Sequence, residues 1–159
     1  MTSHRADHQT YLGLRQQVLT LTPGQLGDAV SVDEPLLALL METGYPEAVA
    51  TLVAVADGSA SLYFSNGGGI IGAGAHPSVA EASSRWRDVA GDFLEQLPSV
   101  TDPSPPEKGL TQFVGVTRVG LRGAVAPEVD LGERTHPLSP LFYAGQDVIT
   151  QIRLATGER

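Results

Sequence analysis

The stretch Ser65–Gly74 contains the residues whose types and spacing could most directly do chemistry, and it reads Ser-Asn-Gly-Gly-Gly-Ile-Ile-Gly-Ala-Gly. Its Gly67-x-Gly69-x-x-Gly72 pattern matches the glycine fingerprint with which dinucleotide-binding proteins hold a pyrophosphate. That fingerprint works when its glycines open a helix, whereas here two isoleucines intervene and a helix cannot easily begin before Pro77. We therefore keep a small-ligand or nucleotide binder, with the backbone amides of this stretch as an anion nest, as the alternative interpretation.

The same stretch also fits a structural turn. Asn66-Gly67 is a typical hairpin pair, so residues 65–68 would reverse the chain and residues 69–73 would add a short strand. Glycines in a strand let another backbone come close, and a dimer partner or a bound peptide would supply such a backbone. The candidate ligand- or partner-binding residues of this stretch are Ser65, Asn66, Gly67, Gly68 and Gly69.

Two histidines complete the set of candidate binding residues. His76-Pro77-Ser78 and His136-Pro137-Leu138-Ser139 each stand where a helix is expected to begin, which by itself explains the proline and the serine. No Gly-x-Ser-x-Gly elbow presents a nucleophile, and nothing in the spacing of the histidines and a carboxylate such as Asp147 requires a metal. We keep His76 and His136 as candidates for ligand or partner contact, and we predict no catalytic residue, no metal site and no cofactor.

The charges exclude two classes of partner. The 159 residues carry 10 basic and 18 acidic side chains, a net charge of −8, and no Lys or Arg occurs between Arg15 and Arg85. This acidic half lacks the cations that nucleic acid and anionic membranes attract, so neither is an expected partner. Glu42 and Glu47 flank a Gly-Tyr-Pro turn, and we expect them to be solvated rather than to act as an acid–base pair.

The absence of cysteine and the shortness of the apolar runs exclude several kinds of site and indicate a compartment. Without cysteine, disulfides, zinc–thiolate sites and thiol nucleophiles are removed together. No apolar run approaches the length of a membrane span, and Met1–Asp7 lacks the apolar core of a signal peptide. We therefore expect a cytoplasmic protein.

The candidate residues must be positioned by a mixed set of helices and strands. Periodicity, capping residues and turn signals predict helices at 9–20 and 33–43, strands at 47–56 and 60–65, a helix at 77–97, strands at 111–119 and 120–126, and a final helix from 139. The strand at 47–56 is almost wholly apolar and should be central, and Asp57-Gly58 predicts the hairpin turn that follows it. Segments 98–109 and 127–137 should be a surface connection and a polar loop.

The sequence thus predicts an α+β fold in the order α-α-β-β-α-β-β-α. Its central sheet should be mainly antiparallel, with about five strands and with helices on both faces. We expect a single globular domain over residues 9–159, preceded by a flexible tail over residues 1–8.

The segment from Leu36 to Gly69 resembles the roadblock / dynein light chain family, which has a profilin-like fold. The resemblance rests on a helix, the apolar strand Ala48–Ala56, the Asp57-Gly58 turn, a second strand and a glycine-rich turn before a long helix. It implies a non-catalytic module of a kind that forms homodimers through helix and strand edges and regulates small GTPases or scaffolds larger assemblies. The leading expectation is therefore a non-enzymatic interaction or regulatory module that contacts a second copy of itself or another protein.

Overall fold

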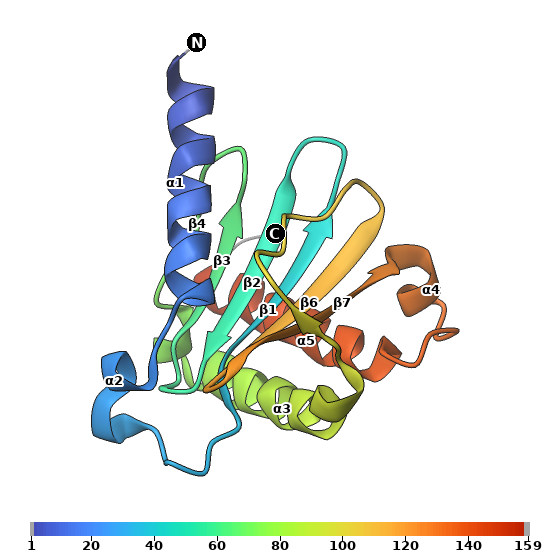
Figure 1. Cartoon of the computed structure of the whole chain (residues 1–159). Helices are drawn as coiled ribbons and strands as arrows, with labels where there is room; N and C mark the ends of the chain where they lie inside the picture. Colours follow the sequence, from blue (N-terminus) through green and yellow to red (C-terminus); the bar gives the residue numbers. More distant parts are fainter. Residues whose placement is uncertain (1, 158–159) are drawn as a thin grey trace.

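The computed structural model describes residues 2–157, which form one antiparallel sheet with helices against both faces (Figure 1). The seven strands run in the order β4-β3-β2-β1-β6-β7-β5. They are β1 (Leu36–Gly44), β2 (Val49–Val55), β3 (Ala60–Phe64), β4 (Gly69–Ile70), β5 (Ser99–Val100), β6 (Leu110–Thr117) and β7 (Gly120–Pro127). The helices are α1 (Thr2–Leu19), α2 (Pro23–Leu26), α3 (Pro77–Phe93), α4 (Glu128–Gly132) and α5 (Ser139–Thr156), with 3-10 turns η1 (Gly27–Ala29), η2 (Ala73–Ala75) and η3 (Leu94–Gln96). The α+β class with a mainly antiparallel sheet is confirmed, whereas the strand number and the element order differ from the prediction.

Strand β1 lies in the middle of the sheet, and the helix predicted over residues 33–43 is wrong. All 9 residues of β1 are buried, and the strand pairs with β2 on one side and with β6 on the other. A wholly apolar run has no periodicity that separates a buried helix from a buried strand, and burial on both faces outweighs the helix propensity of leucine. The apolar strand β2 is consequently next to the centre of the sheet rather than at it.

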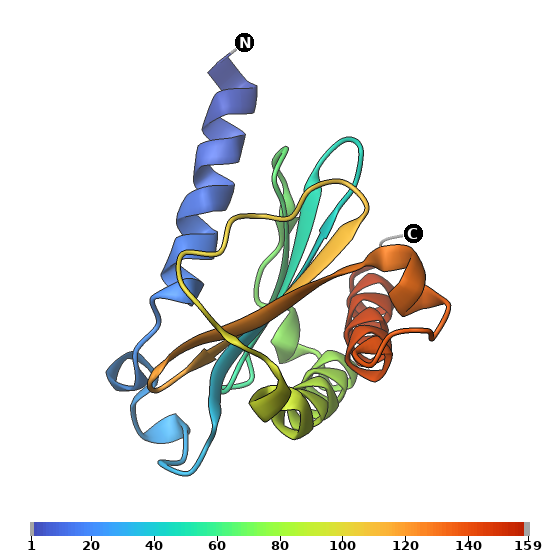
Figure 2. The same ribbon diagram turned by 45° about the vertical axis from the view of Figure 1, so that its right-hand side comes forward.

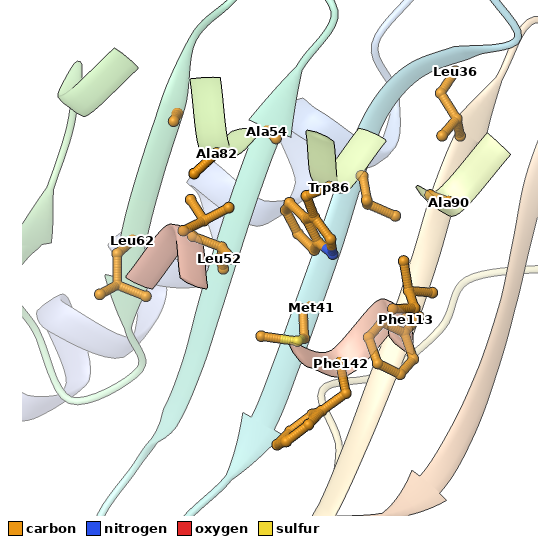
Figure 3. Close-up of a cluster of buried hydrophobic side chains, with 14 of the residues drawn as sticks. Leu36, Met41, Leu52, Ala54, Leu62, Ala82, Trp86, Ala90, Phe113 and Phe142 are labelled. Carbon is orange, nitrogen blue, oxygen red and sulfur yellow. The ribbon is translucent and has the colours of Figure 1, made fainter. Parts of the chain in front are cut away.

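Helices α3 and α5 cover one face of the sheet and enclose the larger apolar core (Figure 3). Trp86 of α3 is fully buried in this core, close to Met41 of β1 and Gly145 of α5. A Cβ at Gly145 would come within 2.8 Å of the Met41 sulfur and 3.1 Å of the indole Nε1. The missing side chain therefore sets how closely α5 approaches α3 and the sheet.

Helix α1 and the proline-rich segment 101–108 cover the opposite face (Figure 2). Tyr11, Val18 and Leu19 of α1 belong to a second core cluster with Leu40 and Val53 of the sheet. Helix α1 extends past the end of the sheet in both views (Figures 1 and 2). Residues 2–8 are therefore helical where we expected a flexible tail, and their mobility in solution stays a prediction.

Smaller elements account for the remaining differences. The predicted Asp57-Gly58 turn joins β2 to β3. Of its two residues, Gly58 alone has a positive φ, +98°. Strand β4 is the short extra strand expected after the glycine turn, and β5 forms within the predicted surface connection. Helix α4 replaces part of the predicted polar loop at 127–137. Strand β1, where a helix was expected, and the short strand β5 raise the number of strands from the expected five to seven.

Candidate functional site

The glycine turn at residues 65–69 lies against helix α1. The Gly67 N–H donates to the Phe64 carbonyl at 3.0 Å, and Gly67, Gly68 and Gly69 all have positive φ. A Cβ on Gly67 would lie 2.7 Å from the carboxyl group of Asp7, which belongs to α1. The segment that packs closely against this glycine turn is therefore helix α1 of the same chain, and not the dimer partner or bound peptide that we had considered.

The same geometry bears on the anion nest expected at this turn. The Val49 N–H donates to the Ser65 Oγ at 2.7 Å, which ties the turn to β2. A hollow of only about 60 Å³ remains between the turn and α1. A bound phosphate would share that space with the Asp7 carboxylate, and like charges so close repel. Nucleotide binding at Asn66 and its neighbouring glycines thus gains no support from the arrangement.

A buried carboxylate is the centre of the main polar cluster, and the expectation that Glu42 is solvated is wrong. Glu42 is 0% exposed. Arg15 of α1 donates from Nε to Glu42 Oε2 at 2.6 Å and from Nη2 to Oε1 at 2.8 Å. Thr51 Oγ1 and Gln112 Nε2 donate to the same carboxylate at 2.9 and 3.0 Å. One carboxylate on β1 therefore joins α1 to β2 and β6.

The donors of this cluster also hold the proline-rich segment. Arg15 Nη2 donates to the Pro103 carbonyl at 2.7 Å, and Gln112 Nε2 donates to the Ser104 carbonyl at 2.8 Å. The Tyr11 hydroxyl lies 2.7 Å from Thr51 Oγ1. Because these buried groups satisfy one another and exclude solvent, we interpret the cluster as the fastening of α1 and segment 101–108 to the sheet.

The pKa values in the cluster favour a charged Arg15 and a neutral phenol. Burial, followed by the nearby charge of Glu42, raises the pKa of Tyr11 to about 12. Burial would lower the pKa of Arg15, but the hydrogen bonds and charge of Glu42 outweigh it, so the pKa is raised. Arg15 therefore stays protonated, and the Tyr11 hydroxyl keeps its proton at neutral pH.

His76 and His136 lie at opposite ends of the helical layer. His76 precedes α3, His136 precedes α5, and the two helices run antiparallel (Figure 1). His136 Nδ1 accepts a hydrogen bond from the Leu138 N–H at 3.0 Å. Ser139, expected to be the N-cap of the last helix, is instead its first residue, after Leu138. The structure thus does not bring the two histidines together.

His136 borders a hollow of about 500 Å³ at the start of α5. Arg134, His136, Pro137, Ser139, Pro140 and Tyr143 line this α5 hollow. The Arg134 guanidinium lies 4.1 Å from the centroid of the Tyr143 ring, and the Tyr143 hydroxyl donates to the Gly132 carbonyl. Of the candidate residues, His136 is thus the one that lines this α5 hollow.

A second hollow, of about 360 Å³, lies at the end of the sheet where β6 turns into β7. Its lining includes Val32, Asp33, Glu34, Leu94, Glu95, Arg118, Val119 and Arg122, and we call it the valine hollow. Val119 and Val32 are 93% and 83% exposed, more than any other large apolar side chain of the described residues. None of the seven predicted site residues lines it, so this surface was not predicted from the sequence.

No protein-family model, curated protein or solved structure matches this chain. The roadblock-like resemblance therefore stays a prediction, and the first element of its pattern, at 36–44, is a strand rather than a helix. Within residues 7–157, no three His, Asp or Glu side chains of those described are grouped as they would be to hold a metal ion. Within residues 2–157, no helix is both long and apolar enough to cross a membrane.

Proposed function

We propose that this chain is a non-enzymatic interaction module that associates with a second copy of itself through the valine hollow. The observation that carries the proposal is the convergence of Val32 and Val119, the two most exposed large apolar side chains described, on one hollow. Exposed apolar side chains that gather around a concavity with a polar rim are typical of protein–protein contacts.

The charges around the hollow favour a second copy as the partner. Asp33, Glu34 and Glu95 line it together with Arg118 and Arg122. Neither arginine forms an ion pair with a described carboxylate. In a two-fold symmetric contact, the acidic side of each copy faces the basic side of the other, so a surface with both signs can be complementary to itself.

Both arginines are held in place before any partner arrives. Arg118 Nη2 donates to the Ser31 carbonyl at 2.7 Å, and Arg122 Nη1 donates to the Leu97 carbonyl at 3.0 Å. Fixed side chains lose little conformational freedom on association, which favours binding. The arrangement therefore offers a partner a surface that is largely formed in the single chain.

The polar clusters elsewhere support a non-enzymatic role. Glu42 is sealed from solvent by Arg15 and its other donors, so a substrate cannot reach it. His136 uses Nδ1 to hold the Leu138 N–H, and the Ser139 Oγ has no hydrogen-bond partner among the described residues. A serine nucleophile is activated by a hydrogen bond from its hydroxyl to a base, and Ser139 makes no such bond here. We retain the cytoplasm as the expected compartment.

Light scattering over a dilution series tests the proposal. The wild-type chain should pass from dimer to monomer, and Val119→Lys should weaken the dimer roughly a hundredfold, because an apolar contact is lost from each copy. Val119 is 93% exposed, so the substitution should leave folding unchanged. Val129→Lys is the matched control, since Val129 is also exposed (61%) but follows the other end of β7. A wild-type monomer at all concentrations, or equal effects of the two lysines, would contradict the proposal.

A further inference from the structure

We propose that the α5 hollow binds the phosphate group of a phosphate monoester, a function beyond the self-association proposed above. The polar side chains that line this hollow with a donor for a ligand are Arg134 and His136, and the Ser139 hydroxyl is buried in its wall. Each can present a hydrogen-bond donor, and no carboxylate lines the hollow. A set of donors without a competing acceptor is complementary to an oxyanion. The lining of this hollow thus differs from the chain as a whole, whose net charge is −8.

Arg134 is placed to donate from its guanidinium. Its guanidinium carbon lies over the Tyr143 ring, 4.1 Å from the centroid, and this contact holds the group at the hollow without using its N–H donors. Arg134 makes no ion pair with any described carboxylate. Its φ of +62° is the left-handed conformation common for the residue that follows the C-cap of a helix, here α4.

The hydrogen bond at Nδ1 fixes how His136 can contact a ligand. Because Nδ1 accepts the Leu138 N–H at 3.0 Å, the proton of the neutral ring is on Nε2. Nε2 is then a donor in both the neutral and the protonated state of the ring. His136 therefore adds a second donor whatever its charge.

Ser139 places a buried hydroxyl in the wall of the hollow. The residue is only 4% exposed and lines the hollow, yet its Oγ has no partner among the described residues. Buried hydroxyls are nearly always hydrogen-bonded, so this unpaired donor in the wall favours an acceptor group within the hollow. Ser139 also opens α5, whose 18 residues place the positive end of a helix dipole at this position.

The rest of the lining fits the organic part of a small ester. Pro137, Pro140 and the ring of Tyr143 supply apolar walls, and about 500 Å³ is within the size range of small-molecule sites. The phosphate can belong to a free metabolite or to a phosphorylated side chain of a partner protein. The chemistry recognised is the same for both, and the probes below separate them.

Titration calorimetry with inorganic phosphate, phenyl phosphate and a phosphoserine pentapeptide tests the inference. We expect saturable binding of at least one phosphorylated probe and none of phenol or the unphosphorylated peptide. Tighter binding of phenyl phosphate indicates a metabolite, and tighter binding of the peptide indicates a protein partner. Absence of binding by all three phosphorylated probes at millimolar concentration would overturn the inference while leaving the dimer test unaffected.

Three variants assign the site, and each is chosen to keep the fold. Arg134→Gly relieves the positive φ, His136→Asn keeps an acceptor for the Leu138 N–H, and Ser139→Ala removes an unpaired hydroxyl. Each should weaken binding roughly tenfold or more without lowering the melting temperature. Arg85→Gln, on α3 and outside the hollow, should bind like wild type. Unchanged binding in Arg134→Gly would refute the assignment.

Discussion

Removing Arg15 should release helix α1 from the sheet at a large cost in stability. In Arg15→Met the buried Glu42 carboxylate loses hydrogen bonds of 2.6 and 2.8 Å and its only counter-charge within 4 Å among the described side chains. Loss of one partner of a buried ion pair costs about 3–5 kcal/mol. Since Thr51 and Gln112 still donate to Glu42, we place this variant near the lower end, at about 3 kcal/mol.

The reverse change should be as damaging, and the double change should cost less than the sum of the two single changes. Glu42→Leu leaves the Arg15 charge buried, with the Pro103 carbonyl as its remaining acceptor, and should cost about 3–5 kcal/mol. In the double variant neither charge remains, so the two costs should fall short of adding by about 2 kcal/mol. That shortfall is the coupling energy of the buried pair.

Urea unfolding of the four proteins measures these differences. With a slope of about 2 kcal/mol per M for a chain of this size, a loss of 3 kcal/mol moves the midpoint by about 1.5 M. The exposed pair Arg85–Asp147, at 3.2 Å with side chains 61% and 45% exposed, is the internal control, and Arg85→Met should cost less than about 1 kcal/mol. If Arg15→Met costs no more than Arg85→Met, the cluster does not fasten α1 and the argument fails.

Three further predictions concern packing and protonation. The pKa of Tyr11, raised by burial from 10.0 to about 12, exceeds its value in the unfolded chain, so its contribution to stability is complete below pH 10 and is lost as the pH rises toward 12; Tyr11→Phe should remove that pH dependence from the urea midpoint. Gly67→Ala should lower stability by about 1–3 kcal/mol, because φ is +106° and the new Cβ meets Asp7, and Asp7→Ala should restore part of the loss. Gly145→Ala should cost about 1–3 kcal/mol and shift the fluorescence of Trp86, the one tryptophan; an unchanged spectrum would show that α3 and α5 do not meet there.

The amphipathic and turn-bounded elements could be predicted from the sequence, and β1 could not. The long helix α3 and the β2–β3 hairpin have clear signals in Trp86 and its apolar neighbours and in Asp57-Gly58. The run Leu36–Met41 is apolar at every position, so its conformation depends on the strands beside it. The conformation of the element at the centre of the sheet is therefore determined by its pairing with the neighbouring strands rather than by its local sequence.

The candidate sites divide in the same way. A signal for the buried cluster was available, because Glu42 is the one charge in a long apolar segment and Arg15 is the last cation before Arg85. The valine hollow joins Val32 to Val119, which are far apart in the chain, and no local pattern links them. His136 was identified as a candidate, but its neighbour Arg134 was missed, because only the folded loop places that side chain on Tyr143.

The distance between two copies beside the valine hollow tests the proposed self-association most directly. The chain has no cysteine, so Gln96→Cys and Val129→Cys each accept one spin label, and double electron–electron resonance then measures the distance between labels in the dimer. Gln96 is exposed and follows Glu95 of the hollow without lining it, so a label there leaves the Val119 contact in place. The account predicts a short, narrow distance for labels at 96 and a longer one for labels at 129. Labels at 96 that show no dipolar coupling, or that lie farther apart than those at 129, would contradict it.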